Sequence, residues 1–235
     1  MLSTFFGEYG GEMCMGIVAI SVASRRARWT RTFLMVNEKK EHELAELNRM
    51  MAASCLCELR KTALNVVPGI GSADARLLFI GEAPGKKEDE TGEPFVGAAG
   101  KFLNEMLASI GLNREDIYIT NVVKYRPPNN RDPLPEEVAA CWPWLRAQVE
   151  LIAPKIIVLL GRHALERFVP GKRISVEHGK AFRRTVPDLG TYVFFALYHP
   201  AAALYNGSMR ETLMKDFAKI PKILEMLGKE KRNPL

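Results

Sequence analysis

The stretch RLLFIG, residues 76–81, is a short and almost continuous apolar run that ends in a glycine. Such a run is typical of a strand that is buried on both faces of a parallel sheet. Three further segments have the same character, namely DIYITN (116–121), KIIVLLG (155–161) and YVFFAL (192–197). The sequence therefore predicts four buried strands.

Segments with helical features separate these strands. Gly111 would end a helix over residues 100–110, and residues 135–152 begin with proline and two acidic residues, which favour a helix start. Further helices are expected over residues 37–54, 163–168 and 210–227. Strands that alternate with helices predict an α/β fold with three layers, α/β/α, around a central four-stranded parallel sheet.

The predicted elements also suggest the domain organisation. Residues 35–235 are expected to form a single domain. Residues 1–34 are rich in glycine, methionine, serine and arginine and show no helical period. We interpret them as a disordered extension or as the result of a mis-assigned start, with a basic DNA-contacting arm as the alternative.

The composition excludes several classes of protein. The chain has 235 residues, a net charge of +6 and only four cysteines. The basic excess suits a polyanionic partner, because lysine and arginine release the counterions condensed on phosphates. The cysteines are too few and too scattered for a secreted disulfide framework, so a cytoplasmic location is expected. No apolar stretch approaches the roughly 18 residues that span a bilayer, so no membrane partner is expected.

Three motifs lie at the carboxyl ends of the predicted strands, where a parallel sheet of this kind places its site. They are GEAPGKKEDETGEPFVGAAG (81–100), TNVVKYRPPNN (120–130) and HPAAALYN (199–206). The first contains a small-residue loop, and such loops let backbone amides approach a phosphate or a base edge. It is not a P-loop, because no Gly-Lys-Ser/Thr follows at the required spacing.

Two polar residues directly follow strands and could carry chemistry. The carboxamide of Asn121 offers a donor and an acceptor side by side, which matches O4 and N3–H of a pyrimidine. A turn-capping asparagine is the alternative. His199 could donate a hydrogen bond to an oxygen that gains charge as a leaving group departs. The other histidines, His42, His163 and His178, have no motif partner, and we interpret them as structural.

The motifs GEAPG, PFVG-x-AG, TN-x-V-K-x-RPP-x-N and HPAA-x-L-x-N, in this order, resemble the uracil-DNA glycosylase superfamily, and specifically its family 4. The likeness runs from about Cys57 to the last predicted helix. It implies an α/β/α fold with a parallel sheet, a DNA repair enzyme and uracil-containing DNA as the partner. We expect a monomer that cleaves the N-glycosidic bond of an everted deoxyuridine and leaves an abasic site.

The resemblance also implies roles for residues of the first motif. Glu82 would lie in the uracil pocket and shape the catalytic loop. Ala83 stands where other families of the superfamily place a water-activating aspartate, so a strong general base is not expected. Glu88 would close the pocket against the C5 methyl group of thymine, and Phe95 would stack on the flipped uracil.

The other two motifs would complete the site. Asn121 would bind O4 and N3–H of uracil, and His199 would hydrogen-bond O2 and stabilise the departing anion, so that Glu82, Asn121 and His199 are the implied catalytic residues. Residues 201–206 would form the loop that enters the minor groove and fills the space that the extruded base leaves. The implied DNA-binding residues are Arg126, Asn130, Pro200, Ala201, Ala202, Ala203 and Leu204.

The cysteine set departs from the family pattern. Family 4 members typically hold a [4Fe–4S] cluster on four cysteines. Cys57 and Cys141 match two of these positions, whereas Ser54 and Tyr125 occupy the others and Cys55 lies one residue late. The set is therefore incomplete, which argues against an intact cluster and leaves Cys55, Cys57 and Cys141 as candidate ligands. No other cofactor is expected.

Two other functions remain open from the sequence. One is a relative with altered specificity, which excises other deaminated bases or binds uracil irreversibly. The other is a non-catalytic nucleic-acid-binding module with a degenerate pocket. The presence of Phe95, Asn121 and His199 favours catalysis over the second of these.

Overall fold

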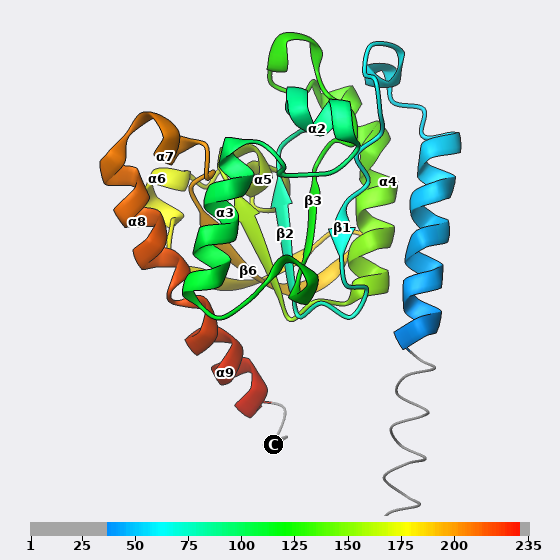
Figure 1. The fold of residues 1–235 in the computed structure, drawn as a ribbon. Coiled ribbons are helices and arrows are strands. Elements are labelled where there is room, and N and C mark those ends of the chain that lie inside the picture. Colours follow the sequence, from blue (N-terminus) through cyan, green and yellow to red (C-terminus); the bar gives the residue numbers. More distant parts are fainter. Residues whose placement is uncertain (1–36, 231–235) are drawn as a thin grey trace, which may run out of the picture. The chain divides into compact units, whose positions relative to one another are not determined.

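The computed structural model describes residues 37–230 (Figure 1). The chain divides into two units, residues 1–39 and 40–235. Of the first unit, residues 37–39 are described, and they are helical. The predictions made for residues 1–34 lie outside the described residues. The second unit contains a sheet, the helices that cover it and a cavity at one edge of the sheet.

Six strands form one sheet in the order β1-β3-β2-β4-β6-β5. The strands β3, β2, β4 and β6 pair in parallel, whereas β1 and β5 are antiparallel to their neighbours at the two edges. The strand bounds are β1 (Ile70–Gly71), β2 (Leu77–Gly81), β3 (Tyr118–Asn121), β4 (Ile156–Leu160), β5 (Ala181–Val186) and β6 (Gly190–Leu197).

The four predicted strands are present and pair in parallel, but the prediction of a four-stranded sheet was wrong in the number of strands, because the antiparallel edge strands β1 and β5 were not predicted. The strand β1 contains only two residues, which is too short for a hydrophobic pattern. Most residues of β5 are exposed, and two adjacent arginines, Arg183 and Arg184, lie in its middle. Exposed charged residues are common on edge strands, so a search for buried apolar runs misses strands of this kind.

Helices connect the strands and cover the sheet. Residues 37–54 form one helix, and its residues 40–54 belong to the second unit. The others are α2 (Lys86–Thr91), α3 (Ala98–Ser109), α4 (Pro135–Ile152), α5 (Arg162–Phe168), α6 (Ile174–Glu177), α7 (Ala202–Tyr205), α8 (Gly207–Phe217) and α9 (Ile220–Glu230). Short 3₁₀ turns are η1 (Glu58–Lys61), η2 (Arg114–Asp116) and η3 (Pro128–Asn130).

The single helix predicted over residues 210–227 is divided into α8 and α9. Ala218 follows the end of α8, and Pro221 occupies the second position of α9. Proline has no N–H to donate and its ring collides with the preceding turn, so it is tolerated in the first turn of a helix but not in its interior. The chain therefore ends one helix and starts another at this point.

Each strand of the sheet centre packs on both faces. In β2, Leu78 and Ile80 belong to one apolar core with residues of α4 and α5, whereas Leu77 and Phe79 belong to a second core with residues of α3 and α8. Successive side chains of a strand point to opposite faces, so two apolar cores on one strand require helices on both sides. Figure 1 shows α3 and α8 on one side of the sheet and α4 on the other. No helix of the described residues is long and apolar enough to span a membrane.

A buried lysine fixes the end of β3. The side chain of Lys124 is fully buried. Its Nζ donates to Thr120 Oγ1 at 2.6 Å, to the Asn121 carbonyl at 2.9 Å and to Gln148 Oε1 at 2.8 Å. Burial lowers the pKa of Lys124 to about 7. These hydrogen bonds connect the carboxyl end of β3 to α4 and hold the backbone of Asn121 in place.

Candidate active site

A cavity of about 350 Å³ lies at the carboxyl ends of the parallel strands. It brings together eight of the residues that the sequence singled out, although they come from three separate segments. These residues are Glu82, Ala83, Glu88, Phe95, Asn121, Asn130, His199 and Ala201.

Asn121 ends β3 at the base of the cavity. The residue is 2% exposed, and its Oδ1 is buried without a hydrogen-bond partner among the described residues. A buried amide oxygen that lacks a partner costs about 1–3 kcal/mol, so native proteins rarely keep one without a reason. The amide of Asn121 is therefore available to a ligand rather than used by the fold.

Gly81 lets this amide and an aromatic ring approach the strand. In the β2–β3 register, Gly81 lies opposite Asn121. A Cβ atom at Gly81 would lie 2.4 Å from Asn121 Oδ1 and 2.9 Å from Phe95 Cζ. Any side chain at this position would displace one of the two groups that face the cavity.

Phe95 is held in a strained conformation beside the amide. Its φ angle of 55° lies in the left-handed region, which side chains other than glycine seldom adopt. Arg114 donates to the Phe95 carbonyl at 3.1 Å and to the Pro94 carbonyl at 2.7 Å. A Cβ atom at Gly100 would lie 1.7 Å from the Phe95 carbonyl oxygen, so the helix start after the loop also needs a glycine. These constraints place the ring in the cavity wall.

His199 lines the cavity beside Phe95. The two rings are stacked with centroids 5.5 Å apart. The backbone N–H of Ala201 donates to His199 Nδ1 at 3.2 Å, so this nitrogen carries the lone pair. Burial lowers the pKa of His199 to about 4, and the nearby Glu88 opposes this shift in part. The ring is therefore neutral near pH 7 and carries its proton on Nε2.

Glu88 is fixed by the backbone at the start of α3. Its Oε1 accepts hydrogen bonds from the N–H groups of Val96 at 3.0 Å and Gly97 at 2.9 Å. A Cβ atom at Gly85 would lie 2.7 Å from the other carboxylate oxygen. The side chain is thus a rigid part of the cavity wall.

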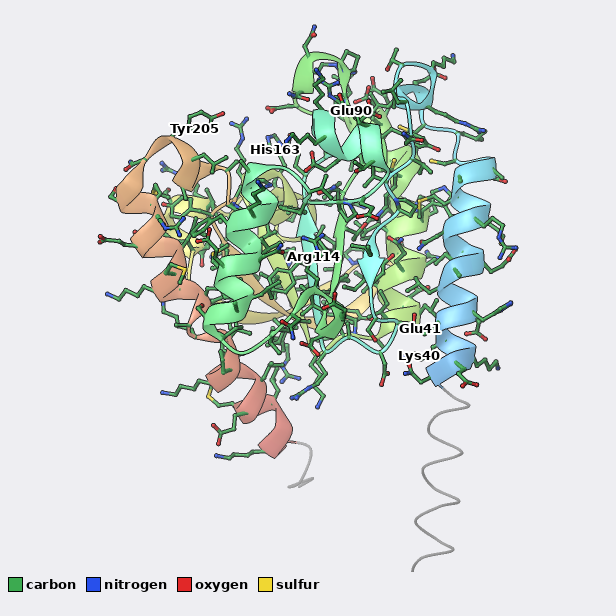
Figure 2. The ribbon with its side chains drawn as sticks, in the orientation of Figure 1. Lys40, Glu41, Glu90, Arg114, His163 and Tyr205 are labelled. Atoms are coloured by element: carbon green, nitrogen blue, oxygen red, sulfur yellow. The ribbon has the colours of Figure 1, made fainter. Side chains whose placement is uncertain are left out.

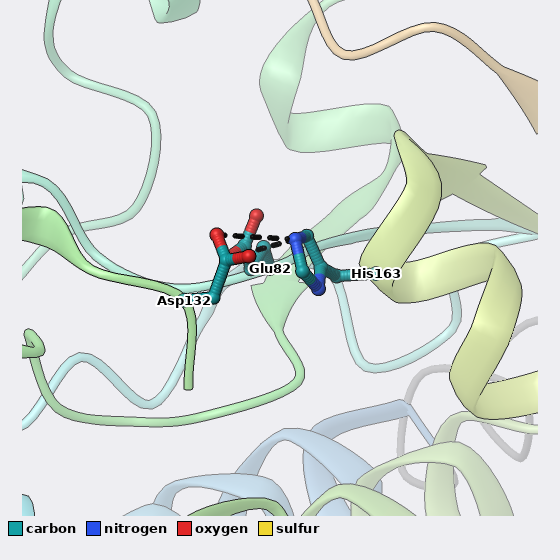
Figure 3. Close-up of side chains that lie close together, drawn as sticks. All are labelled: Glu82, Asp132 and His163. Carbon is teal, nitrogen blue, oxygen red and sulfur yellow. Dashed lines mark ion pairs between the residues drawn. The ribbon is translucent and has the colours of Figure 1, made fainter. Parts of the chain in front are cut away.

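Glu82 lines the cavity from the end of β2, and its environment is unusual for a carboxylate. Burial and the charge of Asp132 raise the pKa of Glu82 to about 7, and Arg162 opposes the shift. His163 Nε2 lies 3.5 Å from Glu82 Oε1 and 3.3 Å from Asp132 Oδ1 (Figure 3). The neighbouring Ala83 offers no ionisable group.

Asp132 and Arg162 were not predicted from the sequence as part of the site, and His163 was predicted to be structural. A signal was present, because His163 follows strand β4 by three residues and so lies at the same edge of the sheet as Asn121 and His199. No motif marked it, and its contact with Glu82 joins residues that are far apart in the chain. Arg131, which also lines the cavity, was missed for the same reason.

The predicted DNA-binding residues lie in two segments at this edge. Residues Ala202–Tyr205 form the short helix α7, where a loop was expected. Leu204 is 47% exposed, and Tyr205, which the sequence did not single out, is 91% exposed and projects from the end of α7 (Figure 2). In the second segment Arg126 Nε donates to Asn130 Oδ1 at 2.8 Å. Whether these residues contact DNA stays a prediction.

Three cysteine side chains meet between the end of the helix 40–54 and α4. Cys55, Cys57 and Cys141 are free and buried, and the Cys141 side chain lowers the pKa of both Cys55 and Cys57. Ser54 is exposed, whereas its neighbour Cys55 is buried and belongs to this group. Tyr125 is 3% exposed, and its hydroxyl has no hydrogen-bond partner among the described residues.

This donor set does not match that of a [4Fe–4S] cluster. Such a cluster is normally bound by four thiolates, whereas the described residues here supply three thiols and one phenol. The set therefore does not fit a four-thiolate cluster. The resemblance to family 4 implies a cysteine at position 125, where this chain has Tyr125.

Comparison with known proteins agrees with this geometry. Residues 68–227 match the model of the uracil DNA glycosylase superfamily. A type-4 uracil-DNA glycosylase from Archaeoglobus fulgidus is 50% identical over 80% of this chain and 94% of its own length. A type-4 uracil-DNA glycosylase from Thermotoga maritima is 44% identical over 79% of this chain and 97% of its own length. The chain belongs to the uracil DNA glycosylase superfamily, and among its relatives it is similar to proteins of type 4.

The protonation state of His199 can be tested directly. Because Nδ1 accepts from Ala201 and burial lowers the pKa, long-range ¹H–¹⁵N NMR should detect the neutral Nε2–H form throughout about pH 5.5–8. Exposed His42 in the same spectra supplies the reference for an accessible ring. An Nδ1–H form, or a midpoint near the ordinary histidine value, would contradict the structure.

Proposed function

We propose that this protein excises uracil from DNA by hydrolysing the N-glycosidic bond of an everted deoxyuridine, which leaves an abasic site. The observation that carries the proposal is the buried and unpartnered Oδ1 of Asn121, in one cavity with Phe95 and neutral His199. The type-4 glycosylase relatives support the same activity.

Uracil recognition follows from the groups at the base of the cavity. The Oδ1 of Asn121 accepts from N3–H, and its amide N–H₂ donates to O4. Cytosine presents a donor and an acceptor in the opposite order, so the same amide rejects it. Phe95 stacks on the base, and the rigid carboxylate of Glu88 excludes the C5 methyl group of thymine.

Catalysis depends on stabilising the leaving group. A base inside the duplex is out of reach, so the enzyme extrudes it at a cost of a few kcal/mol. Bond cleavage produces an oxocarbenium-like sugar and a uracil anion. His199 Nε2–H donates to O2 as charge develops there, and one preorganised donor of this kind contributes about 3–4 kcal/mol. With a pKa of about 4, His199 acts as a neutral donor near pH 7 rather than as an acid.

DNA binding is assigned to the rim of the cavity. The residues that follow His199, Pro200 to Leu204, insert into the minor groove and occupy the space that the extruded base leaves. Arg126 and Asn130, which lie in the segment 120–130, contact the sugar-phosphate backbone of the DNA. The net charge of +6 favours a polyanionic partner.

Replacing His199 by alanine tests the leaving-group role. In single-turnover assays on a uracil-containing oligonucleotide, with alkali cleavage of the abasic product, excision should fall at least about 100-fold. Binding to uracil-containing DNA should persist, because Asn121 and Phe95 remain. His42→Ala, at an exposed helix position, is the control and should keep the wild-type rate. An undiminished rate for His199→Ala would exclude the assigned role, and an inactive wild-type protein would refute the proposed function.

Replacing Asn121 by aspartate tests base recognition. The ratio of uracil excision to cytosine excision should fall at least about 10-fold, because each mismatched buried hydrogen bond costs about 1–3 kcal/mol. Asn113→Asp is the matched control, because Asn113 is exposed, starts η2 and can be replaced there by aspartate. An unchanged ratio in Asn121→Asp would count against amide-based discrimination.

We also infer that the protein does not assemble a four-thiolate cluster. Protein purified without oxygen should contain substoichiometric iron and sulfide and no thiolate-to-iron absorbance, because the residue at the fourth position is Tyr125. Tyr125→Cys supplies a fourth thiol beside Cys55, Cys57 and Cys141, and should raise both contents. About four irons and four sulfides per wild-type chain would overturn this inference.

A further inference from the structure

A series of hollows leads from the cavity to the edge strand β5. The cavity shares Glu82 with a neighbouring hollow of about 390 Å³. That hollow shares His163 and Glu166 with a second one of about 380 Å³, which in turn shares Lys172 with a third of about 260 Å³ beside β5. Since neighbouring hollows have residues in common, they form one groove that begins at the cavity.

The part of the groove farther from the cavity is rich in positive charge. Its two hollows are lined by three carboxylates, those of Asp132, Glu166 and Glu177, and by twice as many cations. The cations of these two hollows, which together form the basic groove, are Arg162, Lys172, Arg173, Lys180, Arg183 and Arg184. By contrast, α2 (KKEDET), which borders the cavity through Glu88, has two lysines and three acidic residues. A polyanion that extends from the cavity is therefore attracted toward the basic groove.

Two of the three carboxylates of the basic groove are paired with cations. Glu177 lies 3.1 Å from Lys172 Nζ and 3.9 Å from Lys180 Nζ. Asp132 Oδ2 accepts a hydrogen bond of 2.7 Å from Arg162 Nη2. Because these carboxylates are neutralised within the protein, they repel a bound anion less than free carboxylates would.

Arg173 and Arg184 are the cations that are available to a ligand. Both are exposed, and neither has a hydrogen bond or an ion pair with another of residues 37–230. Arg173 directly precedes α6, and Arg184 lies within β5, two residues after Phe182. Phe182 packs on the core that includes residues of α4 and α5, so the side chain of Arg184 lies on the same face of the sheet. Exposed guanidinium groups without a partner suit phosphate oxygens, which they can bind through two parallel hydrogen bonds.

We propose that the basic groove binds the sugar-phosphate backbone of the DNA strand on one side of the everted nucleotide, with Arg173 and Arg184 contacting phosphates. The inference rests on the proposed function, because a nucleotide held in the cavity remains covalently joined to its neighbours. Its strand must leave the cavity along the protein surface, and the groove is continuous with the cavity through Glu82. The strand carries one negative charge per nucleotide, which complements the charge of the groove. This contact is separate from those assigned to residues 200–204, Arg126 and Asn130.

Arginines in an edge strand also have a purely structural use, because they prevent the strand from pairing with another sheet. Such a use concerns the isolated protein and does not involve DNA. Phosphate contacts, by contrast, release counterions, so binding that depends on them weakens as the salt concentration rises. The salt dependence of DNA binding therefore distinguishes the two roles.

The test is the affinity for a duplex that contains one 2′-fluorinated deoxyuridine, in which the fluorine disfavours the oxocarbenium-like sugar and so slows excision. The plot of log affinity against log salt concentration should become less steep by about 0.9 for Arg173→Gln and for Arg184→Gln, because each variant loses one phosphate contact. At about 0.1 M salt the affinity should fall about 5- to 10-fold for each variant. These losses should vanish when the duplex is shortened on one side of the uracil, and persist when it is shortened on the other.

Arg76→Gln is the matched control, since Arg76 is exposed and directly precedes β2, at the edge of the sheet opposite the cavity. It removes the same charge and should keep the wild-type slope. The inference is wrong if Arg173→Gln and Arg184→Gln also keep that slope, or if their losses are the same whichever side is shortened. With unchanged slopes, a loss of binding to a polyglutamate peptide would assign the groove to an acidic protein segment instead. A wild-type protein for which these slopes are as expected but which leaves uracil in DNA would refute the proposed function alone.

Discussion

The register between β2 and β3 is the constraint on which the cavity depends. It places Gly81 opposite Asn121, and the absence of a side chain at Gly81 leaves room for the Asn121 amide and the Phe95 ring. His199 reaches the same edge from β6, where a Cβ atom at Gly161 would lie 3.1 Å from its Cβ. Backbone hydrogen bonds between parallel strands therefore determine where groups from three distant segments meet. A shift of one residue would turn the side chain of Asn121 to the opposite face of the sheet.

The cavity contains features that destabilise the fold, and the surrounding structure compensates for them. An unpartnered buried amide oxygen and a strained non-glycine residue each cost on the order of 1–3 kcal/mol. Lys124 fixes the backbone beneath Asn121, while Arg114 and Glu88 bind the backbone on either side of the Phe95 ring. Asn121 and Phe95, which carry these costs, both line the cavity. Such an arrangement is expected where a protein preorganises groups for a ligand.

Apolar side chains pack around the three thiols. Leu44 and Met51 of the helix 40–54 belong to the same apolar core as Leu145 and Val149 of α4. Burial of such side chains contributes about 1.5–3 kcal/mol each and so helps to join the two helices. None of the three cysteines lines the cavity at the edge of the sheet.

The local sequence determined those features that depend on neighbouring residues. The four buried strands could be predicted from continuous apolar runs, and Pro135 with two acidic residues marked the start of α4 correctly. Asn121 and His199 could be singled out because each lies at the end of such a strand or directly follows it.

By contrast, the sequence of the edge strand β5 shows no apolar pattern. Most of its side chains are exposed, because β5 lies at the edge of the sheet and pairs with one strand, β6. Only the tertiary structure decided that Cys55 and not its neighbour Ser54 belongs to the buried group with Cys141, because the fold buries the side chain of Cys55 and exposes that of Ser54. It also decided that His163 contacts Glu82, because that contact depends on the pairing of β2 with β4, and no local pattern in the sequence encodes the distance between two strand ends.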